Sequence, residues 1–309
     1  MPFGKHSAPE ENQRKADDAA SLRSLQAGSL PLQAQRRLSE ETAQKDKFFT
    51  SDLSINEFFL TRQQGCEPLG QVMGSSIYHV GWQRVRSSSL STMSSELTTL
   101  SGAHQQAAQL ALNRLKQEAE ALKAHGVIGV RFTRRSYEWG KDLVEYTAIG
   151  TAIRLPKGLR PNATFLSDLS GQEFWTLLQA GYNPVGLAMG YCSYFVSLGE
   201  FKTQLITSTY YDAPPTNRMV TPFAKAISTA RKLAMKRVVT MARIYKAAGI
   251  VGLHIDCERK MLEHNDNLNL MVHFAAIGTA ISTSGKKVAI PAPSSILTFT
   301  DLPRPTENR

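Results

Sequence analysis

The chain lacks the cysteine pattern of a secreted, disulfide-bonded protein. Its 309 residues include three cysteines, which lie far apart and form no C-x-x-C pair: Cys66, Cys192 and Cys257. An odd number of widely spaced cysteines argues against a disulfide framework and favours reduced, buried thiols. We therefore expect a protein of a reducing compartment, the cytoplasm.

Long apolar runs are missing too. The longest, residues 268–281, is interrupted by Asn269 and His273 and is too short to span a bilayer. The first 20 residues are polar and charged, unlike the apolar core of a signal peptide. These absences predict a soluble, cytoplasmic protein with no transmembrane segment.

The short motifs of common enzyme active sites are also absent. The sequence contains no G-x-S-x-G, no G-x-x-x-x-G-K-[ST], no H-E-x-x-H and no dinucleotide-binding fingerprint. A nucleophile needs a base held beside it, and no pattern identifies a base for Cys192. We predict that the protein is not an enzyme, and that it carries no cofactor other than the divalent metal considered below.

Composition is that of a globular protein with an excess of basic residues. Apolar residues make up 42% and charged residues 20% of the chain, which argues against an intrinsically disordered protein. The formal net charge is +10 and the isoelectric point about 9.6. This excess permits an anionic partner without identifying one.

What the sequence has instead is an internal repeat. Ser-Asp-Leu-Ser at 51–54 recurs 116 positions later at 167–170, followed by matching Glu-Phe, Gly, Pro, Gly and Met-Gly positions. Farther along, Ala-Ile-Gly-Thr-Ala-Ile at 148–153 recurs at 276–281, now 128 positions later. A repeat of this length indicates two copies of one structural unit, the second with small insertions.

Each copy predicts the same order of elements. Serine three residues before glutamate forms a capping box at the start of a short helix, Ser54 with Glu57 and Ser170 with Glu173. Each short helix stops at a glycine that can adopt the left-handed conformation, Gly65 or Gly181. An extended segment, a long amphipathic helix and two strands follow. We predict an α+β fold of two tandem β-α-β-β repeats, each a small antiparallel sheet with one long helix.

The expected domain boundaries follow from the repeat. Residues 1–46 form a flexible or partly helical N-terminal arm, 47–155 the first domain, 164–282 the second, and 283–309 a C-terminal tail. A three-stranded sheet with one helix leaves a face and its edges uncovered. We expect the sister repeat or other chains to cover them. Residues 297–302 resemble the lead-in of each repeat and predict a strand that pairs with an edge.

The repeated pattern resembles the YbjQ-like domain family, also called a heavy-metal-binding domain family. The resemblance rests on two glycines in the first strand (Gly70 and Gly74; Gly186 and Gly190), an alanine-rich helix ending in Gly-[VI]-[IV]-Gly, and a strand closing on Gly-Thr-Ala. It covers about 52–155 and 168–282.

The resemblance implies a β-α-β-β unit that assembles into rings, typically pentamers. This chain departs from the family by joining two units and by two polar stretches, 87–101 and 208–221. The resemblance therefore predicts a homo-oligomer, either a ring of five two-domain chains or two stacked rings.

The family's description directs attention to metal ligands. His254, Asp256 and Glu258 alternate along a predicted strand and share one face, and His273 lies on the returning strand. Such ligands suit a divalent transition ion. The alternative interpretation is a set of satisfied polar groups on a sheet, because the first copy has different residues at the aligned positions: Arg131, Thr133 and Arg135.

A second candidate site is a cationic stripe on the long helix of the second copy. Lys225, Lys232, Lys236 and Arg243 recur at steps of seven, four and seven, opposite the apolar face. The stripe could bind phosphate-rich polymers or anionic lipid headgroups. The alternative is a solvated or intersubunit face.

Taken together, these features predict a non-catalytic oligomeric scaffold or binding protein built from duplicated YbjQ-like domains. Two alternatives stay open. One is a metal- or small-ligand-binding protein that uses the second repeat. The other is a protein that binds an anionic polymer or a membrane surface through helix 225–246.

Overall fold

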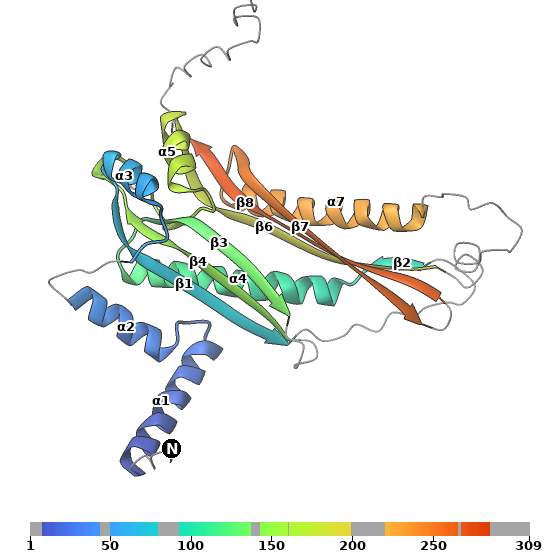
Figure 1. The fold of residues 1–309 in the computed structure, drawn as a ribbon, viewed down its shortest axis with the longest axis horizontal. Coiled ribbons are helices and arrows are strands. Elements are labelled where there is room, and N and C mark those ends of the chain that lie inside the picture. The colour runs from blue at the N-terminus through green and yellow to red at the C-terminus, as the bar shows by residue number, and fades with distance from the viewer. Residues whose placement is uncertain are drawn as a thin grey trace, which may run out of the picture.

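The fold comprises two sheets and six α-helices over the residues that a computed structural model describes, which are 8–43, 50–79, 93–136, 143–159, 161–198, 220–264 and 267–284 (Figure 1). The helices are α1 (Ala8–Gln26), α2 (Leu32–Ala43), α3 (Ile55–Gln63), α4 (Thr98–Ala121), α5 (Gly171–Gln179) and α7 (Thr221–Ile244), with a short 3-10 turn at Lys157–Leu159. The strands are β1 (Glu67–His79), β2 (Met93–Glu96), β3 (Gly126–Ser136), β4 (Leu143–Arg154), β5 (Phe165–Leu166), β6 (Tyr182–Ser197), β7 (Gly249–His264) and β8 (Asn267–Thr283).

Each sheet has four strands where the sequence predicted three. Their orders are β1-β4-β3-β5 and β2-β6-β8-β7, antiparallel except for the parallel pair of β3 and β5. The added strands come from connecting segments: β5 precedes the second half of the chain, and β2 leaves the first half to pair with β6. Both additions satisfy backbone groups at a sheet edge. The α+β class is confirmed.

The two predicted capping boxes are confirmed. The Glu57 amide donates to Ser54 Oγ at 3.3 Å while the Ser54 amide donates to Glu57 Oε2 at 2.7 Å. Ser170 and Glu173 repeat the arrangement at 3.2 and 2.8 Å. The glycines that follow these helices have positive φ, 73° at Gly65 and 78° at Gly181, as the left-handed end of a helix requires.

Helix α4 lies between the two sheets, and α7 covers the far face of the second sheet (Figure 1). Successive residues of β6 show this layering, because Leu187 and Met189 join the core around α4, whereas Ala188 and Cys192 join the core around α7. Alternate side chains of a strand point to opposite faces. Strand β6 is therefore buried on both faces.

Two glycines allow the long helices to contact the sheets directly. A Cβ atom at Gly74 would lie 2.1 Å from the Ala111 carbonyl oxygen of α4, and one at Gly190 would lie 2.1 Å from that of Ala234 in α7. Only a residue without a side chain fits such contacts. Strand and helix backbones are therefore in direct contact at Gly74 and Gly190.

The N-terminal arm contributes α1 and α2, and α2 docks on the first half of the chain. Arg37 of α2 pairs with Glu118 of α4 at 2.7 Å, and the other oxygen of this buried carboxylate accepts the Met73 amide at 2.8 Å. Leu38 is buried beside this contact. A single carboxylate thus connects the arm, the long helix and β1.

Some predicted features lie outside the described residues. They include most of the polar insertion at 208–221 and the predicted edge strand at 297–302. None of the helices that the structure describes is both long and apolar enough to cross a membrane.

Candidate functional site: a polar cluster between the sheets

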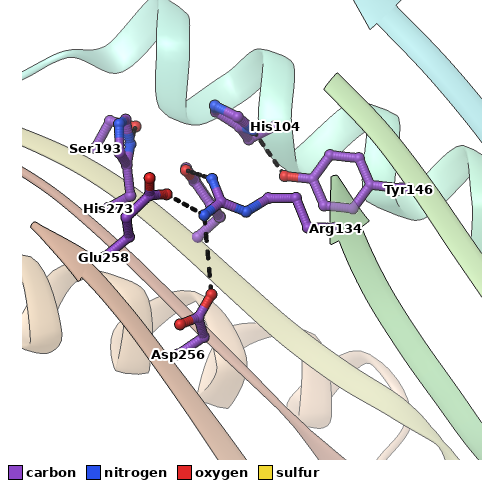
Figure 2. Close-up of polar contacts among 8 residues, drawn as sticks. His104, Arg134, Tyr146, Ser193, Asp256, Glu258 and His273 are labelled. Atoms are coloured by element: carbon purple, nitrogen blue, oxygen red, sulfur yellow. Dashed lines mark hydrogen bonds and ion pairs between the residues drawn. The ribbon is translucent and has the colours of Figure 1, made fainter. Parts of the chain in front are cut away.

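Arg134 forms the centre of a polar cluster between the two halves of the chain. Its side chain leaves β3 and points toward β7, where it meets the carboxylates of Glu258 and Asp256 (Figure 2). Nη2 donates to Glu258 Oε2 and lies 3.9 Å from Asp256 Oδ2, while Nη1 donates to Tyr191 Oη at 3.4 Å. Burial alone would lower the pKa of Arg134, but Tyr191 and Glu258 raise it above its ordinary value.

The same contact has the opposite effect on the pKa of Glu258. Burial favours its neutral form, but the hydrogen bond and the charge of Arg134 outweigh this and lower the pKa of Glu258 below its ordinary value. Both partners are therefore ionised at neutral pH.

An imidazole and two phenols flank this pair. His104 Nδ1 of α4 lies 2.7 Å from Tyr146 Oη of β4, and its ring stacks on that of Tyr191 at 4.2 Å between centroids. Burial, with smaller contributions from the charges of His273 and Arg134, lowers the pKa of His104 to about 3. Burial likewise raises the pKa of both tyrosines above the ordinary value. His104 is therefore neutral at physiological pH.

A second buried imidazole extends the cluster into the second sheet. His273 Nδ1 of β8 lies 2.9 Å from Ser193 Oγ of β6, and the Ser193 amide donates to Ser101 Oγ of α4 at 2.9 Å. Burial, followed by the charge of Arg134, lowers the pKa of His273 to about 4. These contacts join α4 to two strands of the second sheet.

The chemistry of the cluster is that of a structural contact. Ser193 and His273 are the residue types of a nucleophile and base, yet Ser193 is 0% exposed, so no substrate can reach its hydroxyl. Cys192 is equally buried, and burial raises the pKa of its thiol to about 12, which leaves it protonated and unreactive. The cluster fixes the position of one sheet relative to the other.

The structure places two residues of the predicted metal site side by side, Glu258 and His273, but gives each another partner. His254, Asp256 and Glu258 lie exposed along β7, whereas His273 is held against Ser193. The guanidinium of Arg134 already contacts both carboxylates, and a cation at this place opposes a metal ion. Among the described residues, no three His, Cys, Asp or Glu side chains gather as metal ligands would. This arrangement does not fit a metal centre, and the metal site stays an untested prediction.

The sequence pointed to three members of the cluster, but as metal ligands (Asp256, Glu258 and His273), and it did not identify the others. Arg134 aligns with Cys257 of the second repeat, and a charge that replaces a small apolar residue in a strand is the signal that points to it. His104, Tyr146 and Tyr191 give no such signal, because each fits the ordinary pattern of a packed helix or strand.

The predicted cationic stripe is exposed on α7. Lys225, Lys232, Lys236 and Arg243 all face solvent, whereas the neighbouring Arg237 turns inward to Glu96 of β2 at 2.6 Å and donates to the Tyr191 carbonyl at 2.7 Å. An anionic partner for the stripe stays an untested prediction.

Comparison with known proteins places the chain in a family. A family model described as "Putative heavy-metal-binding" (YbjQ) matches residues 60–156. Over 278 residues the chain is 36% identical to a protein of Mycobacterium tuberculosis named encapsulin nanocompartment protein Rv1762c, an alignment that covers 88% of this chain and 98% of the relative. The chain belongs to the family of this nanocompartment protein.

Membership in the nanocompartment protein family points to a structural, non-enzymatic protein. The YbjQ match covers β1 to β4 with α4, and so contains Arg134 and Tyr146 but none of β6, β7 or β8. The resemblance seen in the sequence is thus supported for the first half of the chain.

Proposed function

We propose that this protein is a non-catalytic structural subunit that associates with copies of itself into a closed assembly of the nanocompartment kind. The observation that carries the proposal is the match to the mycobacterial nanocompartment protein along nearly its whole length. The alignment covers 98% of the relative and 88% of this chain, so the proposal does not rest on one shared segment.

The exposed apolar surface supports association. Large apolar side chains are uncovered on the first half of the chain, with Ile55 87% and Phe59 61% exposed on α3, and Met73 45% and Ile77 61% exposed on β1. Soluble monomers rarely leave several large apolar residues on neighbouring elements in contact with water. A second copy would bury them.

We also infer that the subunit is a tandem pair of YbjQ-like units. The order of α3, β1, α4, β3 and β4 recurs in α5, β6, α7, β7 and β8, and both halves share the capping box and the helix-contacting glycine. A ring of five such chains would contain ten units.

Native mass spectrometry of the untagged protein at micromolar concentration tests the proposal. We expect one discrete multiple of 34.1 kDa, and the multiple gives the number of chains directly. A monomer at that concentration would overturn the proposal. A size-exclusion profile that broadens with dilution, without a defined stoichiometry, would also contradict a closed assembly.

A further inference from the structure

A short segment joins the two halves of the chain at the edge of β3. The Ser167 amide donates to the Val127 carbonyl at 2.9 Å, the Val130 amide to the Ser167 carbonyl at 3.0 Å, and the Gly129 amide to the Leu169 carbonyl at 2.8 Å. These bonds continue the parallel pairing of β5 with β3. The segment that leads into the second half thus covers the edge of the first sheet.

The same segment is also anchored in the second sheet. The Ser167 and Thr279 hydroxyls are 3.0 Å apart, and the Asp168 amide donates to Thr279 Oγ1 at 3.0 Å. The Thr279 hydroxyl also donates to the Asp168 carboxylate. Residues 165–170, termed the joint segment below, therefore touch β3 on one side and β8 on the other.

Residues 51–54 of the first half match the joint segment in sequence. They make the contact with their own sheet but not the contact with a neighbouring sheet edge. Ser51 Oγ lies 3.4 Å from Thr151 Oγ1 of β4, and the Asp52 amide donates to that hydroxyl at 3.2 Å, as in the joint segment. Among the described residues, no strand pairs with the other side of this segment. Asp52 and Ser54 are exposed and Ser51 is half-buried, although the counterpart of Ser51 in the joint segment, Ser167, is fully buried.

The second half has a strand edge that matches the edge of β3, and no described segment covers it. Gly249–Leu253 of β7 repeats the sequence pattern of 126–130, and its central glycine has nearly the same φ, 64° at Gly252 against 63° at Gly129. Strand β7 is the last of its sheet. Leu253 is 37% exposed, whereas its counterpart Val130 is buried beneath the joint segment.

The small helices show the same incomplete pairing. Helices α3 and α5 lie side by side at one end of the molecule (Figure 1), where the buried Gly171 amide donates to Glu57 Oε1 at 3.1 Å. The counterpart of Gly171 on α3 is Ile55, which is almost fully exposed, and the counterpart of Glu57 on α5 is Glu173, also exposed. The free face of α3 therefore matches the face that α5 buries.

The sheet faces differ in the same way. Met189 of β6 is buried in the core around α4, while its counterpart Met73 of β1 is 45% exposed. These buried elements of the contact between the halves thus have uncovered counterparts, a free segment in the first half and a free strand edge in the second. One chain therefore carries both members of the unfinished contact.

We propose that copies of this chain bind head to tail through these two surfaces, with residues 50–54 of one copy adding to the Gly249–Leu253 edge of β7 in the next, and α3 packing against its α5. The proposal rests on the self-association proposed above and names its surface. Strand addition supplies backbone hydrogen bonds, and burial of Ile55 and Leu253 supplies apolar contact. A head-to-tail contact generates a ring when its rotation closes.

The competing occupant of the β7 edge is the chain's own tail. Residues 297–302 resemble the joint segment in sequence and lie outside the described part of the structure. If the tail occupied the edge, copies would have to associate elsewhere. The experiment must therefore separate a neighbouring chain from the tail.

Disulfide trapping between two differently tagged copies makes this distinction. Leu166 and Val127 are register partners in the internal joint, so the intermolecular counterparts are Thr50 and Ile250. One copy carries Thr50→Cys and the other Ile250→Cys, both in a Cys257→Ser background because the other two cysteines are buried. After co-expression and mild oxidation, we expect a covalent dimer that contains both tags. Val127→Cys with Leu166→Cys in one chain is the matched control and should cross-link within the monomer.

A surface substitution provides the second readout. Ile55→Asp should shift the native mass from the assembly to the monomer while the thermal unfolding midpoint of the chain stays within a few degrees, since Ile55 is 87% exposed. Asn56→Asp adds the same charge one position along and should leave the assembly intact.

The outcomes separate the two proposals. A wild-type assembly with no mixed-tag disulfide and no effect of Ile55→Asp would overturn this surface and leave self-association standing. A mixed-tag disulfide that forms only after deletion of residues 285–309 would assign the edge to the tail and also overturn it. A wild-type monomer would overturn the proposed function itself.

Discussion

Arg134 and Glu258 form an ion pair between the two sheets although they are 124 positions apart in sequence. The guanidinium is mostly buried and the carboxylate about half exposed. Arg134 also contacts Tyr191 of β6 and Asp256 of β7, so a single side chain from the first half holds two strands of the second. The contact between the halves is therefore polar at its centre and apolar around it.

Removal of Arg134 should destabilise the protein through the groups left behind. Arg134→Met retains much of the side-chain volume but leaves Tyr191 and Glu258 without their donor. We expect a loss of about 1–3 kcal/mol in the free energy of unfolding, measured by urea denaturation. Arg135→Met is the matched control, because Arg135 is exposed and should change the stability by less than about 0.5 kcal/mol. Equal losses in the two variants would contradict a central role for Arg134.

The two buried histidines should make the fold sensitive to acid. Their pKa values are about 3 for His104 and about 4 for His273, against about 6.5 for an unfolded histidine. Below pH 6.5 the unfolded chain binds more protons than the folded chain, so stability is complete above that pH and is lost as the pH falls toward 4. Each histidine should contribute a slope of about 1.4 kcal/mol per pH unit.

Urea denaturation at pH 7, 6 and 5 measures this slope. His273→Asn removes one titrating group and should flatten the profile, even if it lowers the stability at pH 7. An unaltered slope in His273→Asn would show that this imidazole is not held neutral.

Gly74 should not tolerate a side chain. The Cβ of Gly74→Ala would lie 2.1 Å from the Ala111 carbonyl oxygen and 2.4 Å from the Leu115 amide, so β1 and α4 would have to separate. We expect a loss of about 1–3 kcal/mol, seen as a lower thermal unfolding midpoint. Gly158→Ala is the control, since no atom lies within 4 Å of its added Cβ. Similar midpoints for both variants would contradict the direct helix–strand contact.

Metal content offers a test of the arrangement on β7. Because Arg134 contacts both Asp256 and Glu258, we expect the dialysed protein to retain no stoichiometric divalent metal by inductively coupled plasma mass spectrometry. One equivalent of metal per chain, lost in His254→Ala, would instead restore the metal site predicted from the sequence.

Much of the fold could be predicted because its signals are local. The capping box at Ser54 and Glu57 depends on residues three positions apart, and the left-handed glycine at Gly65 follows directly from the end of a short helix. The repeat added the equivalence of the two halves, in which Gly74 and Gly190 occupy matching positions.

The sequence named Asp256, Glu258 and His273 but did not predict the polar cluster, since its members come together only through tertiary packing. His104 lies on a helix, Tyr146 on a strand of the first sheet and His273 on a strand of the second, and no sequence spacing relates them. Strand β2 was missed for a similar reason: a four-residue segment in a serine-rich stretch becomes a strand only because the edge of β6 is available to it.

The sequence by itself determined the repeating order of elements, since hydrophobic periodicity, caps and glycines act over a few residues. Only the tertiary structure decided how the two units meet. The joint segment at 165–170 and its counterpart at 51–54 have nearly the same sequence, yet the first is buried and the second largely open. The difference arises because hydrogen bonds across a sheet edge depend on which strand is placed beside it, and that placement is a property of the packed chain.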